Sequence, residues 1–237
     1  VDARLVSLPG FLGMELGLGN VTDSNLAAMG GLYSLREGGW WRQALSLCGL
    51  TAERVPEVVP VGEAISVGRG AAGLAEDCAV VLAGNDQTSG AFANSCREGG
   101  MVVTLGTALV VYRYAGENPG PYHAGACWGP YPGGGYYELA TRAEGCRALD
   151  WARREIAPGE SPAAFDAAAK SALDEQGMPG REWCMFYPQR IGKEGVWRGT
   201  GSTGERAHAV LEGITFVLRY LIESELHTDD HPSEITV

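Results

Sequence analysis

The sequence predicts an α/β fold, and three observations support this prediction. Two short apolar runs, 79–83 and 101–105, each end in a polar turn that contains glycine, and a helix-compatible segment, 88–96, lies between them. Near the end of the chain, apolar residues recur at helical spacing from Val210 to Ile222, as expected of an amphipathic helix. Glycine supplies 35 of the 237 residues, about twice its usual share, which indicates many tight turns between strands.

Composition argues against several classes of protein. With 45% hydrophobic and 20% charged residues, the chain is typical of a globular protein. A net charge of −11 argues against a nucleic-acid surface, because such a surface needs clustered Lys and Arg. No stretch of about 18 apolar residues is present, so we expect no membrane span. The length permits one large domain or two smaller ones.

The six cysteines indicate a reduced protein. They are widely spaced and include no CxxC pair or Cys/His cluster, which are the patterns of structural zinc sites. We therefore expect no metal-ligating residues and interpret the cysteines as core residues of a cytoplasmic protein. No signal peptide is visible, although Val1 is not a natural start, so a lost leader stays open.

The N-terminal region predicts short helices and then a long extended segment. Residues 1–19 are apolar at mixed spacing and predict one helix with an early kink at Pro9. Residues 40–48 place apolar side chains on one helical face, and Gly49 ends that helix. Residues 51–73 are rich in Pro and Gly and predict extended chain, typical of a crossing between domains. Between the two helices lie three candidate N-caps for a further helix: Thr22, Asp23 and Ser24.

Two aromatic or glycine-rich features have a structural and a functional interpretation. The adjacent Trp40 and Trp41 suit a platform that stacks on a sugar ring, but at this spacing we expect one in the core and the other half-exposed. Residues 117–135 end in a glycine run that suggests a phosphate loop. No Lys-Ser/Thr follows it, so we predict a surface hairpin loop instead.

The second half of the chain predicts helices between irregular segments. A strand is predicted over 108–112 and a helix over 141–156, and Ser161 followed by proline is a good helix start. Residues 185–198 are predicted to be irregular. Residues 234–237 begin what we expect to be a buried strand.

Asp86 and the turn at Gly106 and Thr107 carry the chemistry that the sequence suggests. Asp86 follows an apolar run, and in open sheets functional groups lie at the carboxyl ends of strands. Its carboxylate can accept a proton from a substrate hydroxyl, while Gln87 can bond a second hydroxyl. Gly106 lets a phosphate approach the main-chain N–H groups closely, and Thr107 adds a hydroxyl. The structural alternative is that Asp86 only caps the helix 88–96 and that the turn only joins two strands.

The resemblance of this chain to a known family extends the interpretation. The segment AGNDQTSGAF, followed further along by GGMVVTLGTALVVY, resembles the start of the second domain of the FGGY carbohydrate kinases, such as xylulokinase and glycerol kinase. The N-terminal segment, with TDSN and WWRQAL, is similar to the end of that family's first domain. RAEGCRALDWARREI and ERAHAVLEGITFVLRYLIESEL resemble two helices of the second domain.

The resemblance implies a fold, a reaction and a location. The fold is the two-lobed, actin-like ATPase (ribonuclease H-like) α/β fold, with 1–75 in the first, sugar-binding domain and 76–237 in the second, ATP-binding domain. The reaction is ATP-dependent phosphorylation of a sugar or polyol hydroxyl, with ATP and Mg²⁺ as cofactors. The implied partner is a small-molecule substrate in the cytoplasm, with no nucleic acid and no membrane, and a homodimer is left open.

The resemblance also implies roles for individual residues. Asp86 matches the general base, and Gln87 falls where some members contact the polyol. Gly106 and Thr107 match the turn that binds the ATP phosphates, and Thr104 is the hydroxyl residue just before that turn.

Some positions depart from the family pattern. Ala108 stands where many members have Ser, and Arg190 is the only clear remnant of the usual Gly-Glu-Arg-x-Pro segment. The family's N-terminal Asp-x-Gly-Thr loop and its Gly-Gly adenosine motif are absent from the sequence. We therefore expect an internal fragment, incomplete at both ends and inactive alone. One alternative is a non-catalytic member that binds sugar or nucleotide and regulates another protein. Another is an ATPase of the same fold that is coupled to conformational change of a protein.

Overall fold

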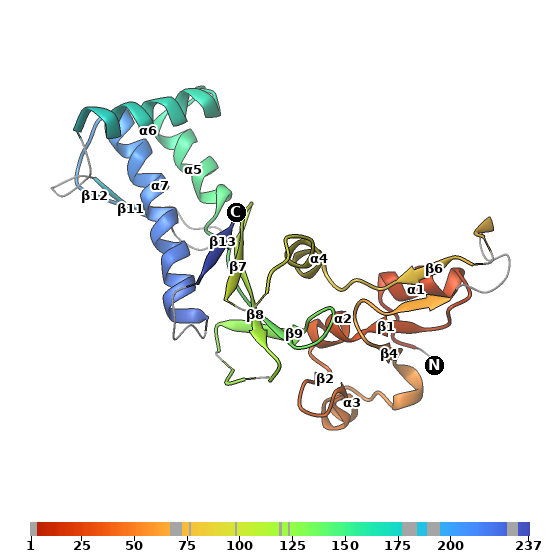
Figure 1. Ribbon diagram of the computed structural model, residues 1–237. Coiled ribbons are helices and arrows are strands. Elements are labelled where there is room, and N and C mark those ends of the chain that lie inside the picture. Colours follow the sequence, from red (N-terminus) through yellow and green to blue (C-terminus); the bar gives the residue numbers. More distant parts are fainter. Residues whose placement is uncertain are drawn as a thin grey trace. The chain divides into compact units, whose positions relative to one another are not determined.

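The structure is a computed structural model, and its described residues are 4–66, 73–75, 77–97, 99–118, 120–122, 124–176, 184–188, 195–226 and 232–237. Figure 1 shows helices and strands interspersed along the whole chain, so the predicted α/β class is confirmed. Two compact units are present. The first comprises Val1–Val102, Tyr112–Leu139 and Pro232–Thr236, and the second comprises Val103–Val111, Ala140–His231 and Val237.

The first unit begins with two short capped helices. Helix α1 (Leu8–Glu15) is shorter than the predicted 1–19, and the Ser7 side chain caps it by accepting the Gly10 N–H. Strand β1 (Val21–Asp23) follows and leads directly into α2 (Ser24–Met29). The carboxylate of Asp23 accepts two backbone N–H groups of α2, so one of the three predicted caps is confirmed.

Short paired strands make up most of the following segment. Strands β2 (Tyr33–Ser34) and β3 (Gly39–Trp40) form an antiparallel pair, and α3 (Arg42–Leu47) comes next. After a 3₁₀ turn (Ala52–Arg54), β4 (Glu57–Val59) pairs in parallel with β1. Strand β5 (Ala64–Ser66) pairs antiparallel with β6 (Ala79–Val81), so part of the predicted extended segment is strand.

The largest sheet has five strands in the order β13-β7-β8-β10-β9. The chain forms it from β7 (Gly100–Leu105), β8 (Leu109–Gly116), β9 (Ala126–Pro130), β10 (Tyr136–Arg142) and β13 (Glu234–Thr236). Strand β13 runs parallel to β7. The strand predicted at 234–237 is therefore confirmed, but its burial was wrong, because Ile235 is 47% exposed.

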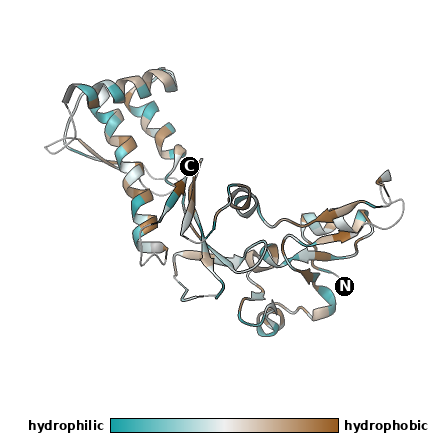
Figure 2. Cartoon of the chain, viewed as in Figure 1, coloured by the Kyte–Doolittle hydropathy of each residue, from teal (hydrophilic) through white to brown (hydrophobic). Residues whose placement is uncertain are grey.

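Helices dominate the second unit. Helix α5 (Cys146–Ile156) is followed by α6 (Pro162–Gln176), β11 (Met185–Tyr187), β12 (Val196–Arg198) and α7 (Thr203–Tyr220), whose last turn continues as a π-helix (Leu221–Glu225). Figure 2 shows hydrophilic and hydrophobic residues interleaved along α6 and α7, as the amphipathic pattern predicts. Buried side chains of these elements form one core: Ala152, Phe165, Ala169, Cys184, Phe186, Ala207, Ala209 and Val210.

Some predicted elements differ from the observed ones. The predicted helix 141–156 begins only at Cys146, because β10 occupies the residues up to Arg142. The segment 185–198 contains the antiparallel pair β11 and β12. The hairpin turn at the end of 117–135 is confirmed, since the Tyr131 N–H donates to the Gly135 carbonyl oxygen.

The cysteines and tryptophans differ in how deeply they are buried. All six cysteines are free, but only Cys96 and Cys184 are buried, so the core prediction fails for the exposed Cys48 and Cys127. Trp40 is more buried than Trp41, which is 44% exposed.

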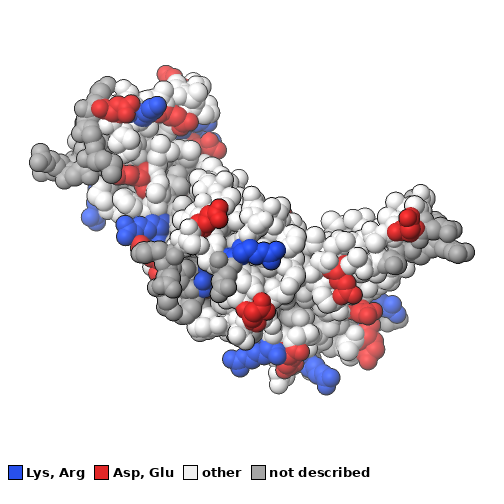
Figure 3. Space-filling view, in the orientation of Figure 1, with Lys and Arg blue, Asp and Glu red and all other residues white. Residues whose placement is uncertain are grey.

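On the face shown in Figure 3, Lys and Arg occur in small separate groups among Asp and Glu. Among the described residues, no helix is long and apolar enough to cross a bilayer.

Candidate functional site

Asp86 is the first residue of helix α4 (Asp86–Ala93), which starts two residues before the predicted segment 88–96. The chain reaches it from β6 through Gly84, whose φ of +77° is a conformation that glycine adopts without strain. Asn85 caps the helix, because its side-chain oxygen accepts the Thr88 N–H at 2.9 Å. The capping role that we considered for Asp86 therefore belongs to its neighbour.

The carboxylate of Asp86 is exposed and stands at a helix N-terminus. Its Oδ1 accepts the Gln87 N–H at 2.8 Å, and the positive end of the helix dipole favours its negative charge. Gln87 beside it is half-buried. An ionised carboxylate that stays accessible to solvent can receive a proton from a hydroxyl group placed against it.

A buried polar cluster lies beneath Asp86. Asn25 and Thr88 are both 0% exposed, and Asn25 Nδ2 donates to Thr88 Oγ1 at 2.9 Å. Asn25 Oδ1 accepts the N–H of Asn85 at 3.1 Å and its Nδ2 at 2.8 Å. Tyr112 Oη donates to Thr88 Oγ1 at 3.1 Å. The start of α4 is thus bonded to α2 and to β8, which lie far from it in the sequence.

Titratable groups around this cluster have raised pKa values. Burial raises the pKa of the Asp23 carboxyl, although N–H groups of Leu26, Asn25 and Gly84 oppose the shift. Burial likewise raises the pKa of Tyr137 to about 12. The rings of Tyr137 and Tyr112 stack with their centroids 4.8 Å apart. This part of the first unit therefore disfavours charge, in contrast to the exposed position of Asp86.

The predicted phosphate turn joins β7 to β8 in the second unit. Thr104 and Thr107 are exposed and Gly106 is half-buried. The Gly106 N–H donates to the Ala108 carbonyl oxygen at 3.1 Å, so this amide is already engaged. The Gly106 carbonyl oxygen accepts the Cys146 N–H at 2.8 Å, which ties the turn to the start of α5. The exposed side chains of this turn that carry hydroxyl groups are those of Thr104 and Thr107.

The backbone of this turn packs closely against the backbone at Gly145. A Cβ atom on Gly145 would lie 2.6 Å from the Gly106 carbonyl oxygen, so only glycine fits there. Asp86 and Gln87 belong to the first unit, and Thr104, Gly106 and Thr107 belong to the second.

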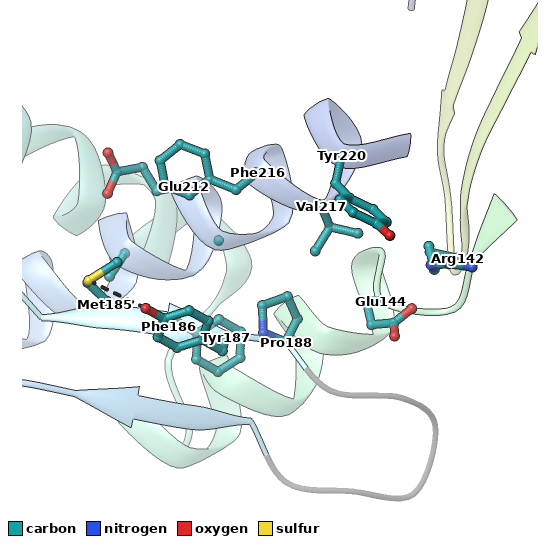
Figure 4. A pocket seen from close by; sticks show the side chains of 12 residues that line it. Arg142, Glu144, Met185, Phe186, Tyr187, Pro188, Glu212, Phe216, Val217 and Tyr220 are labelled. Carbon is teal, nitrogen blue, oxygen red and sulfur yellow. Dashed lines mark hydrogen bonds between the residues drawn. The ribbon is translucent and has the colours of Figure 1, made fainter. Parts of the chain in front are cut away.

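A cavity in the second unit was not predicted from the sequence. It has a volume of about 290 Å³ and lies between α7, β11 and the chain that follows β10. Figure 4 shows Arg142 and Glu144 at one end and Glu212 at the other, with aromatic rings between. The signal that was missed is the exposed pair Phe216 and Tyr220, one helical turn apart on α7. Arg190 lies outside the described residues.

No resident metal site is visible in the described part of the chain. It contains no group of three or more His, Cys, Asp or Glu residues that could hold a metal ion. An ion that is carried by a nucleotide does not need such a group. A magnesium ion that arrives with nucleotide phosphates needs only one or two protein carboxylates and keeps several water ligands.

Comparisons with known proteins identify the fold. No family model matches the chain, and no curated protein matches it. Among solved structures, xylulose kinase from Lactobacillus acidophilus matches 98% of this chain and 50% of its own, with a TM-score of 0.82 at 19% identity. Xylulose kinase from Rhodospirillum rubrum matches 93% of this chain and 47% of its own, with a TM-score of 0.81 at 22% identity.

A third match is a glycerol kinase. Glycerol kinase from Plasmodium falciparum, solved with ADP, matches 92% of this chain and 46% of its own, with a TM-score of 0.75 at 15% identity. At these identities the likeness shows the fold, so the predicted actin-like α/β fold of the carbohydrate kinases is confirmed. The chain spans about half the length of the kinases that it matches.

Proposed function

We propose that the intact protein transfers the γ-phosphoryl group of ATP to a hydroxyl group of a sugar or polyol. The observation that carries the proposal is an exposed carboxylate, Asp86, held at the start of α4 in a fold shared with xylulose and glycerol kinases. The sequence resemblance supports the same reaction. The activity would require the whole protein, because this chain spans about half the length of the kinases that it matches.

In the proposed reaction Asp86 acts as the general base. The substrate hydroxyl donates a hydrogen bond to the Asp86 carboxylate, whose Oδ1 already accepts the Gln87 N–H. As the hydroxyl oxygen bonds to the γ-phosphorus, its proton passes to Asp86 and the bond to the β-phosphate oxygen breaks, which releases ADP. Gln87 is the proposed hydrogen-bond partner of a second hydroxyl of the substrate. Water or bulk base then removes the proton from Asp86 and restores the carboxylate.

ATP is the second substrate and brings Mg²⁺ with it. Thr104 and Thr107, on exposed positions of the β7–β8 turn, are the proposed donors to its phosphate oxygens, with Gly106 allowing close approach. Because the Gly106 N–H is engaged with the Ala108 carbonyl oxygen, it contributes only if that bond opens. Mg²⁺ bound to the phosphates neutralises charge during transfer. The free cysteines support a cytoplasmic location, where ATP is available.

One observation favours a second function. The engaged Gly106 N–H and the methyl side chain of Ala108 leave the turn with fewer phosphate donors than the family pattern provides. A non-catalytic protein that binds a sugar or nucleotide and regulates a partner would tolerate this loss. Such a protein would bind a ligand without consuming ATP.

The test is a phosphotransfer assay on the intact protein. MgATP is offered with a panel of pentoses, hexoses and polyols, and ADP is measured with and without each acceptor. We expect one acceptor class to raise ADP formation at least about tenfold above the acceptor-free rate, since enzymatic turnover exceeds background hydrolysis by many orders of magnitude. Saturable binding of a sugar or ATP with no acceptor-dependent ADP would support the regulatory function instead.

A further inference from the structure

We propose that Asn25 is a positioning residue for Asp86. Its buried amide forms hydrogen bonds with the chain on both sides of Asp86 and so fixes the position of the carboxylate. The inference rests on the proposed function, because it assigns a role in the same reaction. Asn25 lies in α2, 61 positions before Asp86 in the sequence (86 − 25), and its side chain is 0% exposed.

All four hydrogen-bonding positions of the Asn25 amide are filled. Its Oδ1 accepts two donors from Asn85, and its Nδ2 donates to Thr88 Oγ1 and to the Pro130 carbonyl oxygen, each at 2.9 Å. This set also fixes the amide orientation. In the flipped orientation the amide oxygen of Asn25 would face the Pro130 carbonyl oxygen. Its NH₂ group would then face the two donors of Asn85, the backbone N–H and the side-chain Nδ2.

The bonds of Asn25 bracket the two proposed substrate-binding residues. Asn85 immediately precedes Asp86, and Thr88 immediately follows Gln87. Asn25 contacts Asn85 through its oxygen and Thr88 through its nitrogen. Asn85 and Thr88 are also joined to each other by the N-cap bond at 2.9 Å. The backbone of Asp86 and Gln87 is therefore held between two anchored residues.

Gly84 shows how closely the chain passes the amide. A Cβ atom at Gly84 would lie 2.9 Å from both Cγ and Oδ1 of Asn25, a contact that side chains do not tolerate. The φ of +77° at Gly84 excludes most other residues independently. Glycine at this position thus lets the chain reach Asn25 and turn into α4.

A buried amide of this kind specifies one geometry. A buried polar group that loses a partner carries a large desolvation cost, so the bonds hold the loop in a single arrangement. A general base needs such placement, because misplacement by about 1 Å can cost about 100-fold in rate. The exposed Asp86 carboxylate has few contacts of its own to supply this, apart from the Gln87 N–H. The hydrogen bonds of Asn25 to Asn85 and Thr88 supply this placement.

The main test compares Asn25→Ala with a matched control in the intact protein. We expect Asn25→Ala to lower kcat by about 10- to 100-fold while the KM for ATP changes by less than about threefold. Hydrogen exchange of the Thr88 N–H, which the Asn85 cap protects, should become at least about tenfold faster. The control is Tyr131→Phe, which removes a buried hydrogen bond of 2.8 Å to the Cys96 carbonyl in the same unit but none of the hydrogen bonds made by the Asn25 amide. It should leave kcat within about twofold.

A second variant covers the case in which Asn25→Ala does not fold. Asn85→Gly keeps the helix start at small cost but removes the side chain that Asn25 grips. It should lower kcat to a similar extent, and the two losses should not add in the double variant. A kcat for Asn25→Ala or Asn85→Gly equal to that of Tyr131→Phe would overturn the inference.

The exchange measurement separates this inference from the proposed function. Unchanged Thr88 exchange in Asn25→Ala overturns the inference whether or not the protein is active. If instead the wild-type protein phosphorylates no acceptor, the proposed function and the catalytic part of this inference both fail. Faster Thr88 exchange would then still support the grip of Asn25 on the start of α4.

Discussion

Asn85 and Asp86 are adjacent polar residues with different tasks, and the backbone decides which residue takes which. Asn85 has extended φ and ψ angles of −78° and 169°, so its side chain turns back to cap α4. Asp86 is already helical and points its carboxylate outward from the first turn. The sequence could not separate these roles, because Asn and Asp are nearly equal as caps. Of the three candidates Thr22, Asp23 and Ser24, Asp23 is the cap because its backbone is extended (φ −84°, ψ 161°), whereas Ser24 is already the first residue of α2.

Tyr137 provides a residue-scale prediction about pH. Its pKa is raised to about 12 by burial, whereas an unfolded tyrosine titrates near 10. The folded state therefore keeps the proton longer, so this stabilisation is complete below pH 10 and is lost as the pH rises towards 12. We expect the free energy of unfolding of the wild type to fall by about 2 kcal/mol more than that of Tyr137→Phe over this range.

Denaturant titrations of both proteins at pH 9 and pH 11.5 measure this difference. Lysines and other tyrosines also titrate here, but they are common to the two proteins and cancel in the comparison. Equal losses of stability in the wild type and in Tyr137→Phe would show that burial of this phenol is not coupled to folding.

At the scale of elements, segments with a clear apolar pattern were predicted and segments without one were missed. The stripe from Val210 to Ile222 predicted α7, because an amphipathic helix repeats its apolar positions over several turns. Strand β9 was missed, since Ala126–Pro130 contains glycine and proline and shows no alternation of buried and exposed residues. Strands of three residues, such as β4 and β11, are too short to show a pattern at all.

Close packing against α7 gives a prediction at the element scale. A Cβ atom on Gly213 would overlap the Phe186 carbonyl oxygen, a backbone atom that cannot rotate away. Gly213→Ala should therefore lower the free energy of unfolding by about 1–3 kcal/mol, although alanine is the better helix former. Chemical denaturation measures the change.

Gly90→Ala in α4 is the matched control. Nothing lies within 4 Å of a Cβ atom at that exposed helical glycine. The substitution there should raise stability by about 0.5–1 kcal/mol, as expected from helix propensity and the entropy of the unfolded chain. A Gly213→Ala protein as stable as Gly90→Ala would contradict the close approach of α7 to β11.

At the scale of the whole molecule, the fold was predicted from the order of several segments together. No single segment is diagnostic, but their co-linear resemblance predicted the actin-like fold that the xylulose and glycerol kinase structures show. The division into domains at residue 75 stays a prediction. The contacts give two compact units with other limits, in which β7, β8 and β10 each contribute residues to both.

The candidate site was predicted in part. Asp86, Gln87, Thr104, Gly106 and Thr107 were identified as residues by local sequence, and the structure places all of them on turns or element ends. The Asn25 amide beneath Asp86 was not identified, because its partners lie 60 and 63 residues away and only folding brings them together. The hydrogen bond from the Gly106 N–H to the Ala108 carbonyl oxygen could not be predicted from the sequence either, since it depends on the geometry of the turn.

The most direct measurement of the central claim is the turnover of Asp86→Asn in the intact protein. Asn keeps the shape of the side chain but cannot accept the hydroxyl proton, so kcat should fall by about 10²- to 10⁴-fold. The Kd for ATP should change by less than about threefold, because Asp86 acts on the acceptor rather than on the nucleotide. A variant that keeps more than about a tenth of the wild-type kcat would contradict the assignment of Asp86 as the general base.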